Sequence, residues 1–375
     1  MMARKITTTI LVMSDTHGES ISRQSVPKEP LDLVIHCGDL TQHSKLSEFR
    51  KTIDSLAAIK ATLKIIIAGN HDFSLDAPVL CKKIEEAKRT MAEGLDDALL
   101  EREYGKPGEA QQLVQSARRE GIVFLEEGNH TITLDNGASV KIYASPYTPS
   151  AGGEWGFQYN GEHDFNIDAD CDIAITHGPP RGIMDMTEEK TRIGCPGLFK
   201  AIAKVQPKLH CFGHVHAGWG ARFVSWRSTI SGEPSHFTAI DNAQSRVIAT
   251  LSKWKAKDQK GNLNCIESPP LITEDTVESE DTAKPDITIK PDDIVKTDNI
   301  IEKGQITVKT SHKSGQQLFL EAGKTLFVNA ANMGDARLDQ PFWLVDLELS
   351  AGSRKRARDN TEMDDRYTIN KKTIL

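Results

Sequence analysis

The chain has 375 residues, a net charge of −7 and a sequence pI of about 6.0. An acidic chain lacks the extended basic face that binds phosphate backbones, so we expect no broad nucleic-acid binding. No apolar stretch is long enough to span a bilayer, so we expect no membrane association. The six cysteines are scattered without a CxxC pair, and the first residues do not resemble a secretory signal. These features predict an intracellular protein, cytoplasmic in the first instance, with reduced thiols.

Short apolar runs of strand length recur along the chain. They are continuous and rich in Ile, Val and Leu, as in strands that are buried on both faces. In chain order these runs are ITTTILVM (6–13), LDLVIHC (31–37), ATLKIIIA (61–68), CDIAIT (171–176), PKLHCF (207–212), TLFVNAA (325–331) and PFWLVDLELS (341–350). Residues 45–59 have helical spacing between two of the runs, which predicts a βαβ unit. An Asn136–Gly137 pair between two alternating segments predicts an antiparallel hairpin. Together they indicate an α/β fold that mixes parallel and antiparallel strands.

Two stretches interrupt this pattern. Residues 74–121 are charged and helix-prone, which predicts a helical insertion. Residues 255–318 are polar with few aromatics and cannot bury enough apolar surface to offset ordering, which predicts a disordered or loosely held insertion. We therefore expect a single domain made of 1–254 and 319–350, followed by a charged tail, 351–375. A basic cluster in the tail, SRKRARDN, leaves a nuclear location open beside the simpler interpretation of a solvated charge run.

Side chains of metal-ligand type follow five of the predicted strands, each beside a glycine or a sharp turn. His214 and His216 in GHVH are two positions apart, so on an extended chain both would point to the same side. Ligands bind at the carboxyl ends of strands in open α/β sheets, and glycines there let the backbone approach closely. The candidate residues are Asp15, His17, Asp39, Asn70, His71, His177, His214 and His216. Each motif alone has a plain explanation as a helix cap or a turn, but five motifs at five strand ends indicate a common site.

The chemistry of this set suits a pair of divalent cations. Carboxylates, a carboxamide and imidazoles without a thiolate are ligands for Mn, Fe or Zn at open sites. Two ions about 3.5–4 Å apart share a bridging ligand, and an aspartate can span them. A water held between two cations becomes a hydroxide nucleophile near neutral pH, and the same cations neutralise charge on a phosphate. The residues therefore point to hydrolysis of phosphate esters.

The ordered motifs DTH, GD, GNHD, H and GHVH resemble the calcineurin-like metallophosphoesterase superfamily. Further stretches are similar to its metallophosphoesterase-domain-containing (MPPED-type) branch: VIHCGDLT, ASPYTP, WGFQY, THGPPRGIMD, GCPGL and LFVNAAN. The resemblance covers most of 6–240 and 320–350. It implies a four-layer αββα sandwich, in which two mixed β-sheets are flanked by helices.

The resemblance also implies a role for each candidate residue. The residues it assigns to metals are Asp15, His17 and His216 for the first ion, Asn70, His177 and His214 for the second, and Asp39 as the bridge. His71 would face the substrate phosphate as an acid or an electrostatic stabiliser. His71 and Asp39 are therefore the expected catalytic residues.

The leading hypothesis is a metal-dependent phosphodiesterase that acts on a cyclic nucleotide or a related small diester. The preference for diesters comes from the resemblance to the branch. A phosphomonoesterase or protein phosphatase remains an alternative. A non-catalytic scaffold with the same fold is the third, although a scaffold would be expected to lack ligands and none is missing here.

Overall fold

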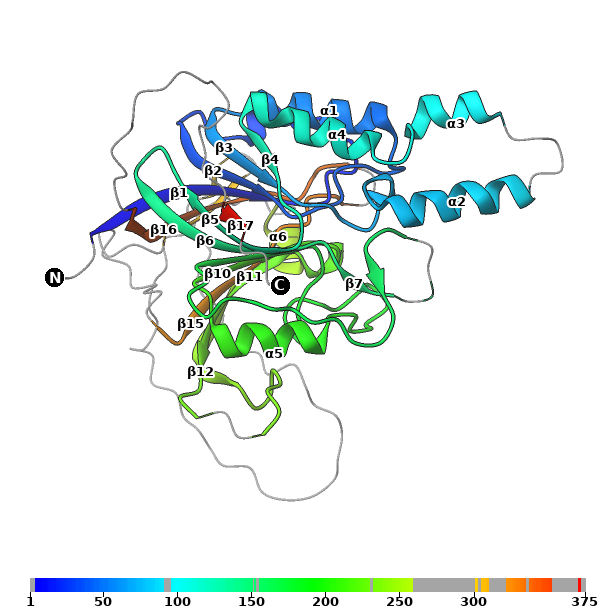
Figure 1. Ribbon diagram of the computed structural model, residues 1–375. Helices are drawn as coiled ribbons and strands as arrows, with labels where there is room; N and C mark the ends of the chain where they lie inside the picture. Colours follow the sequence, from blue (N-terminus) through cyan, green and yellow to red (C-terminus); the bar gives the residue numbers. More distant parts are fainter. Residues whose placement is uncertain are drawn as a thin grey trace.

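The computed structural model describes residues 4–90, 96–150, 152, 155–229, 232–258, 301–302, 305–309, 322–334, 337–352 and 370–371. Two β-layers are stacked between helices, with α1 and α4 on one side and α5 on the other (Figure 1). The helices are α1 (Leu46–Ala57), α2 (Ala77–Thr90), α3 (Asp97–Tyr104), α4 (Glu109–Ser116), α5 (Pro196–Val205) and α6 (Leu251–Asp258). Short 3₁₀ turns occupy Arg23–Ser25, Phe73–Leu75, Ala117–Glu120 and His216–Gly218. In the described ranges, no helix combines the length and the apolar character needed to cross a membrane.

The first β-layer is built around parallel neighbours. Its strands are β1 (Lys5–Met13), β2 (Leu31–His36), β3 (Ala61–Ile66), β4 (Ile122–Phe124), β13 (Ile301–Glu302), β14 (Gln305–Lys309) and β16 (Phe342–Ala351). Strands β1 to β4 pair in parallel in chain order, and β16 pairs antiparallel to β1. The predicted strand–helix–strand unit over the first part of the chain is therefore confirmed by β2, α1 and β3.

The second β-layer also mixes both strand directions. Its strands are β5 (Gly128–Thr133), β6 (Ala138–Ser145), β9 (Ile173–Thr176), β10 (Leu209–Phe212), β11 (Gly220–Trp226), β12 (Ile240–Thr250), β15 (Lys324–Asn329) and β17 (Asn370–Lys371). Strands β6, β9, β10 and β15 run parallel, whereas β11 is antiparallel to β15. The predicted hairpin is confirmed by antiparallel β5 and β6, and Gly137 takes a φ of +86° in their turn. A separate two-stranded ribbon joins β7 (Thr148–Pro149) and β8 (Gln158–Tyr159).

The two layers are continuous along one edge. Strand β16 pairs with β1 over most of its length, and its last residues, Ser350 and Ala351, pair with Ser139 and Ala138 of β6. Hydrogen bonding thus links 15 strands, which fold so that their two halves stack. The expected αββα arrangement is confirmed, with this short seam joining the two sheets.

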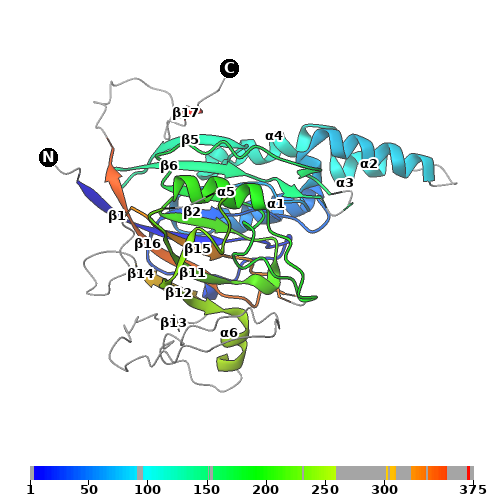
Figure 2. The ribbon, with the colours of Figure 1, turned by 90° about the horizontal axis from the view of Figure 1, so that it is seen from below.

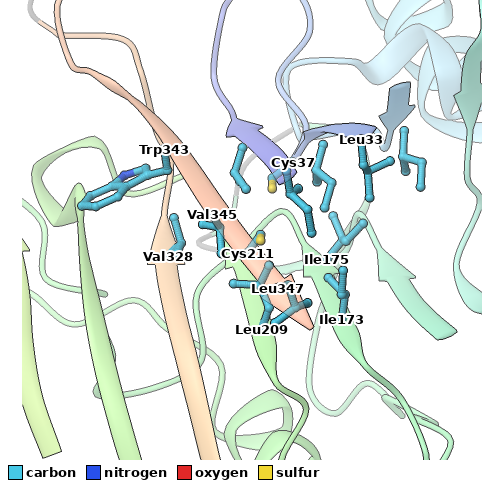
Figure 3. Packing of buried hydrophobic residues seen from close by; sticks show 14 of the residues in the cluster. Leu33, Cys37, Ile173, Ile175, Leu209, Cys211, Val328, Trp343, Val345 and Leu347 are labelled. Atoms are coloured by element: carbon cyan, nitrogen blue, oxygen red, sulfur yellow. The ribbon is translucent and has the colours of Figure 1, made fainter. Parts of the chain in front are cut away.

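Successive side chains of a strand point to opposite faces of the sheet, and this alternation separates the apolar residues into two core layers. On β1, Ile10 and Val12 belong to the cluster between the sheets, whereas Leu11 and Met13 belong to the cluster beneath α1 and α4. All four of these side chains are fully buried. Figure 3 shows the inner cluster, in which Leu33 and Cys37 of the first sheet lie near residues of the second sheet such as Ile175. The continuous apolar runs in the sequence reflect strands that are covered on both faces.

Helix α5 covers the outer face of the second sheet. It begins after Cys195, whose sulfur accepts a hydrogen bond from the backbone N–H of Leu198. Leu198, Phe199 and Ile202 pack with Phe212 of β10 in the third cluster. This helix therefore holds β9 and β10, the strands that precede two of the candidate site loops.

The span 74–121 contains α2, α3 and α4. Ala110 and Val114 of α4 are buried in the cluster beneath α1, so this helix belongs to the outer layer and connects β3 to β4. Helices α2 and α3 extend away from the body of the molecule (Figures 1 and 2). They lie on the same side as the loops that follow β3.

The expectation of a disordered or loosely held insertion at 255–318 stays a prediction, although the structure describes a few of its residues. Strand β14 pairs in parallel with residues 342–346 of β16, and β13 pairs with β14. The backbone of these few residues finds a partner because that side of β16 is otherwise unpaired until Ser350. Residues 259–300, 310–321 and the basic cluster at 353–360 lie outside the described residues.

Truncating the layer between the sheets should destabilise the fold. Leu347 is fully buried in that layer, so Leu347→Ala removes apolar contacts and leaves a cavity between two sheets that cannot collapse freely. We expect the free energy of unfolding to fall by about 2–5 kcal/mol in urea denaturation. The matched control is Leu99→Ala, because Leu99 is 41% exposed on α3. Equal losses in the two variants would contradict the assignment of the core.

Candidate metal centre

The candidate residues come together where the carboxyl ends of the parallel strands of both sheets meet. The DTH loop follows β1, the GD loop follows β2 and the GNHD loop follows β3. In the second sheet, His177 directly follows β9, and the GHVH loop follows β10. Because these strands run in a common direction, all five loops lie at one edge of the sandwich.

Four of these residues have left-handed backbone conformations. The φ angle is +55° at Asp15, +47° at His17, +54° at Asp39 and +66° at His214. Such conformations cost a residue with a side chain on the order of 1–3 kcal/mol each and persist only where the surroundings hold them. Here the first two loops hold each other through backbone hydrogen bonds, from Asp15 N to Gly38 O (2.9 Å) and from His17 N to Asp39 O (3.1 Å). The sharp turns aim these side chains back over the sheet edge.

Two glycines are required by the close approach of the loops. A Cβ at Gly69 would overlap the backbone and carboxylate of Asp39, and a Cβ at Gly213 would overlap the carboxylate of Asp15. The glycines beside the ligand-type residues therefore allow backbone and carboxylates to come within contact distance, as the sequence predicted.

Residues of the first predicted metal set surround a common point. The Nε2 atoms of His17 and His216 are 3.3 Å apart, and His216 Nε2 is 3.4 Å from a carboxylate oxygen of Asp15. The backbone N–H of His214 donates to both oxygens of Asp15 at 3.0 and 3.1 Å, which holds that carboxylate in place. Asp15, His17 and His216 form one group whose ligand atoms lie within 4.8 Å of one another.

The second set lies beside the first. His177 Nε2 is 2.9 Å from Asn70 Oδ1 and 3.4 Å from Asp39 Oδ1. His177 Nδ1 lies 3.0 Å from the carbonyl oxygen of Cys37, which can only accept a hydrogen bond. Nδ1 therefore carries a proton, and Nε2 is the ring atom directed into the site.

Asp39 lies between the two sets. One of its carboxylate oxygens is 3.4 Å from His177 Nε2, and the other is 3.8 Å from His17 Nε2. The backbone N–H of His71 donates to the first oxygen at 2.8 Å. A single carboxylate thus presents one oxygen to each ligand set, which is the geometry that a bridging ligand requires.

The spacing of these atoms fits cations. Two ligands that are each about 2.1 Å from one ion and separated by about 100° lie about 3.2 Å from each other. The distances of 2.9 to 3.4 Å within the two sets agree with that value. The residues present therefore fit divalent metal ions, for which imidazoles and carboxylates are common ligands.

The protonation states are also suited to cation binding. Burial would raise the pKa of Asp15 and Asp39, but the neighbouring imidazoles outweigh it and hold both pKa values well below the ordinary range. Burial lowers the pKa of His214 to about 4 and keeps that ring neutral. His177 is the exception: burial opposes protonation, yet the charge of Asp39 raises its pKa to about 9. A cation that binds at His177 Nε2 must displace this proton.

His214 is the one predicted ligand held somewhat apart. Its ring centroid is 5.0 Å from that of His177, but it belongs to none of the compact groups of three ligand atoms in the described residues. The structure brings His214 to the edge of the second set, and its role as a ligand stays a prediction.

The ring of His71 is fixed from two sides. Its Nδ1 is 2.8 Å from the carbonyl oxygen of Gln42, and its ring lies 4.7 Å from that of His17. On the other side, the Trp155 ring lies over it at a centroid distance of 4.3 Å. Trp155 is 40% exposed, and the next residue, Gly156, donates its backbone N–H to Asn70 O at 3.0 Å. Half-buried His71 thus sits at the mouth of the site, and its contact with substrate stays a prediction.

Sequence reasoning missed three residues that support the centre, although all lie in stretches quoted for the resemblance. The first is Asp72, whose fully buried carboxylate accepts hydrogen bonds from the backbone N–H groups of Leu40, Thr41 and Gly69 and from the Thr41 hydroxyl. Burial, followed by the charge of Asp39, raises the pKa of Asp72 to about 7, whereas these donors favour its ionised form. Asp72 therefore ties the loop of Asp39 to that of Asn70.

The other two supporting residues are Asn329, the last residue of β15, and Asn332, which follows that strand. The Asn332 side chain accepts a hydrogen bond from the backbone N–H of Ser14 at 3.0 Å, directly before Asp15. The Asn329 side chain donates to the carbonyl of Val215 at 3.0 Å, between the two histidines of GHVH. The strand near the C-terminal end of the chain therefore positions ligands that come from both sheets.

Comparison with known proteins places these motifs in a family. The family model for calcineurin-like phosphoesterases matches residues 8–218, a span that contains all eight candidate residues. The chain is 33% identical over 221 residues to human metallophosphoesterase domain-containing protein 1. That alignment covers 57% of this chain and 62% of the human protein. It is 31% identical over 232 residues to the probable rhamnogalacturonate lyase C of Emericella nidulans, covering 60% of this chain but 19% of that protein. The chain thus spans less than two thirds of each of these relatives. A solved phosphopantetheinyl hydrolase from Mycobacterium tuberculosis aligns with a TM-score of 0.36 and 15% identity, covering 59% of this chain and 86% of that one.

Loss of the Asn332 side chain should weaken metal binding. Asn332→Ala leaves the buried backbone N–H of Ser14 without its acceptor and loosens the turn that carries Asp15 and His17. We expect the dissociation constant for Mn²⁺ to rise about 10-fold in calorimetric titration. Asn160→Ala is the matched control, because Asn160 is exposed and far along the chain from any ligand. Unchanged Mn²⁺ affinity in a folded Asn332→Ala protein would show that this contact does not support the centre.

Proposed function

The chain belongs to the calcineurin-like phosphoesterase family, and we propose that it is a dinuclear metal-dependent phosphodiesterase. Its substrate would be a small phosphate diester, with cyclic nucleotides among the candidates. The family relationship confirms the resemblance inferred from the motifs. The substrate class, the presence of two metals and the identity of these metals are parts of the proposal.

The position of Asp39 carries the proposal. Its two carboxylate oxygens face His17 and His177 separately, at 3.8 and 3.4 Å. A single-ion site would need only one of these contacts. Two cations that share a carboxylate would activate water and neutralise charge on the phosphate when bound.

The side chains of this chain then have distinct tasks. Asp15, Asp39 and Asn70 supply oxygen ligands on rigid turns, so the site is preorganised before substrate arrives. Water adds to phosphorus, one P–O ester bond breaks, and the departing oxygen takes a proton. The ring of His71, held by Gln42 and Trp155 at the mouth of the site, is the group placed to supply that proton.

The charge of the site supports a diester over a monoester. Within the described residues, the polar partners of the eight candidate residues include neither Arg nor Lys. A phosphate monoester carries about two negative charges near pH 7, whereas a diester carries one. A centre whose positive charge comes from cations alone is better matched to the singly charged diester.

A substrate panel with one variant tests the proposal. We expect the protein loaded with Mn²⁺ to hydrolyse bis(4-nitrophenyl) phosphate with a higher kcat/KM than 4-nitrophenyl phosphate, and cyclic AMP should be included as a natural diester. Asp39→Asn keeps the shape of the side chain but removes the shared charge. We expect it to lower kcat by at least about 100-fold and to reduce the metal content measured by mass spectrometry.

Asp135→Asn is the matched control, because Asp135 is exposed in the β5–β6 turn. It should retain both metals and full activity. Two bound metals with normal turnover in Asp39→Asn would contradict the bridging role. Faster turnover of the monoester would favour a phosphomonoesterase.

The role of His71 should depend on the leaving group. A nitrophenolate departs readily without a proton, but a ribose oxygen is a poor leaving group and needs one. We therefore expect His71→Ala to retain both metals and to lose about 10²–10⁴-fold in kcat on a ribose-type diester, with a much smaller loss on the nitrophenyl diester. An equal fractional loss on both substrates would leave charge stabilisation as its role. Loss of metal from the variant would make His71 a ligand instead.

A further inference from the structure

A groove leads away from the metal centre along α1. Its first part, a cavity of about 520 Å³, is lined by the candidate ligand His17 and by Glu19, Ser47 and Lys51. A second cavity of about 520 Å³ is lined by Arg23, Ser47, Arg50, Lys51 and Asp54. The two cavities share Ser47 and Lys51, so they lie side by side; together we call them the groove, and His17 lines its first part.

One wall of the groove is the exposed stripe of α1. The helical positions that line the second cavity are Ser47, Arg50, Lys51, Asp54, Ser55 and Ala58. They recur at three- and four-residue intervals, whereas Phe49 and Leu56 on the opposite face are buried in the core. From Ser47 to Ala58 the stripe extends about 16 Å along the helix axis. The groove is therefore much longer than a single phosphate.

The other wall is the segment directly after the DTH motif. Glu19 and Lys51 both line the first cavity, and their charged groups are 4.0 Å apart. Further along, Ser20, Ile21 and Arg23 line the second cavity. Because this segment continues from His17, its position is tied to that of the first metal set.

The charges of the groove change along its length. Near the centre, the carboxylate of Glu48 is committed to the backbone N–H groups of His43 and Lys45, each at 3.0 Å. In the second cavity, Arg23, Arg50 and Lys51 lie beside a single lining acid, Asp54, and Lys51 is also paired with Glu19 at 4.0 Å. On a protein of net charge −7, the two arginines make this a locally positive site next to the cavity that His17 lines.

We propose that the second cavity binds a further phosphate of the substrate, on an arm of the diester that extends along α1. This assignment rests on the proposed phosphodiesterase function and adds its substrate class: a diester with a second phosphate one nucleotide unit or more from the scissile bond. Arginine side chains are suited to this role because their forked N–H groups match phosphate oxygens. A cyclic mononucleotide has no second phosphate to place there.

Three dinucleotides test the groove, because they share one scissile diester and differ only in the second phosphate. They are the thymidine dinucleotide TpT and its forms phosphorylated at the 5′ end (pTpT) or the 3′ end (TpTp). Calorimetry on the Mn²⁺-loaded protein, with dinucleotide analogues whose bridging 3′ oxygen is replaced by an uncleavable methylene group, measures binding without turnover. We expect one phosphorylated form to bind about 5-fold more tightly than TpT, and to show a correspondingly higher kcat/KM with Mn²⁺. This advantage should shrink as salt is added.

The variant Arg23→Ala/Arg50→Ala should abolish that advantage and leave the binding of TpT unchanged. The matched control Arg89→Ala/Arg119→Ala removes two exposed arginines outside the groove and should preserve the advantage. Equal binding of all three dinucleotides to the wild-type protein would overturn the proposal, as would an equal loss for TpT in the groove variant. If no dinucleotide is hydrolysed, the phosphodiesterase assignment fails, while the calorimetric comparison still decides whether the groove binds phosphate.

Discussion

The carboxylate of Asp39 can face two ligand sets only because the backbone around it adopts a conformation that side-chain-bearing residues rarely take. Asp39 and Asp15 both have positive φ angles immediately after buried parallel strands. A strand that simply continued would carry these side chains past the edge of the sheet. The turn is stabilised from outside, by hydrogen bonds between the two loops and by the buried carboxylate of Asp72. Strain at the centre is therefore offset by the packing and hydrogen bonding of the loops around it.

The seam between the sheets explains why ligands from both halves of the chain can meet. Strand β16 is hydrogen-bonded to β1 in the first sheet and, at its end, to β6 in the second. Asn329 at the end of β15 and Asn332 just after it then contact the loops that carry His216 and Asp15. The family model ends at residue 218, yet these contacts come from beyond residue 320. Residues at the C-terminal strands of the core thus help to position the loops that carry the candidate ligands.

Much of this was accessible from sequence, because burial on both faces leaves continuous apolar runs and because ligand-type residues stand at their ends. All seven predicted strands and α1 are present, and the predicted site residues lie close together around Asp39, with His214 somewhat apart. The stacking of Trp155 on His71 could not be predicted, since it depends on how a distant loop lies against the Asn70 loop. The pairing of β14 with β16 could not be predicted either. An edge strand can be held by backbone hydrogen bonds alone, so it does not need an apolar pattern that the sequence would reveal. The groove along α1 is formed by that helix together with the segment after the DTH motif, and this combination produces no recognisable sequence motif.

The most direct test of the account is to locate the cations. Crystals of the protein grown with Mn²⁺ and measured at a wavelength that gives anomalous scattering from manganese would show each ion independently of the protein density. The account predicts two anomalous peaks about 3.5–4 Å apart, with Asp39 between them, His17 and His216 beside one, and Asn70 and His177 beside the other. A single peak that uses only one oxygen of Asp39, or two peaks that leave Asp39 without contact to one of them, would contradict it.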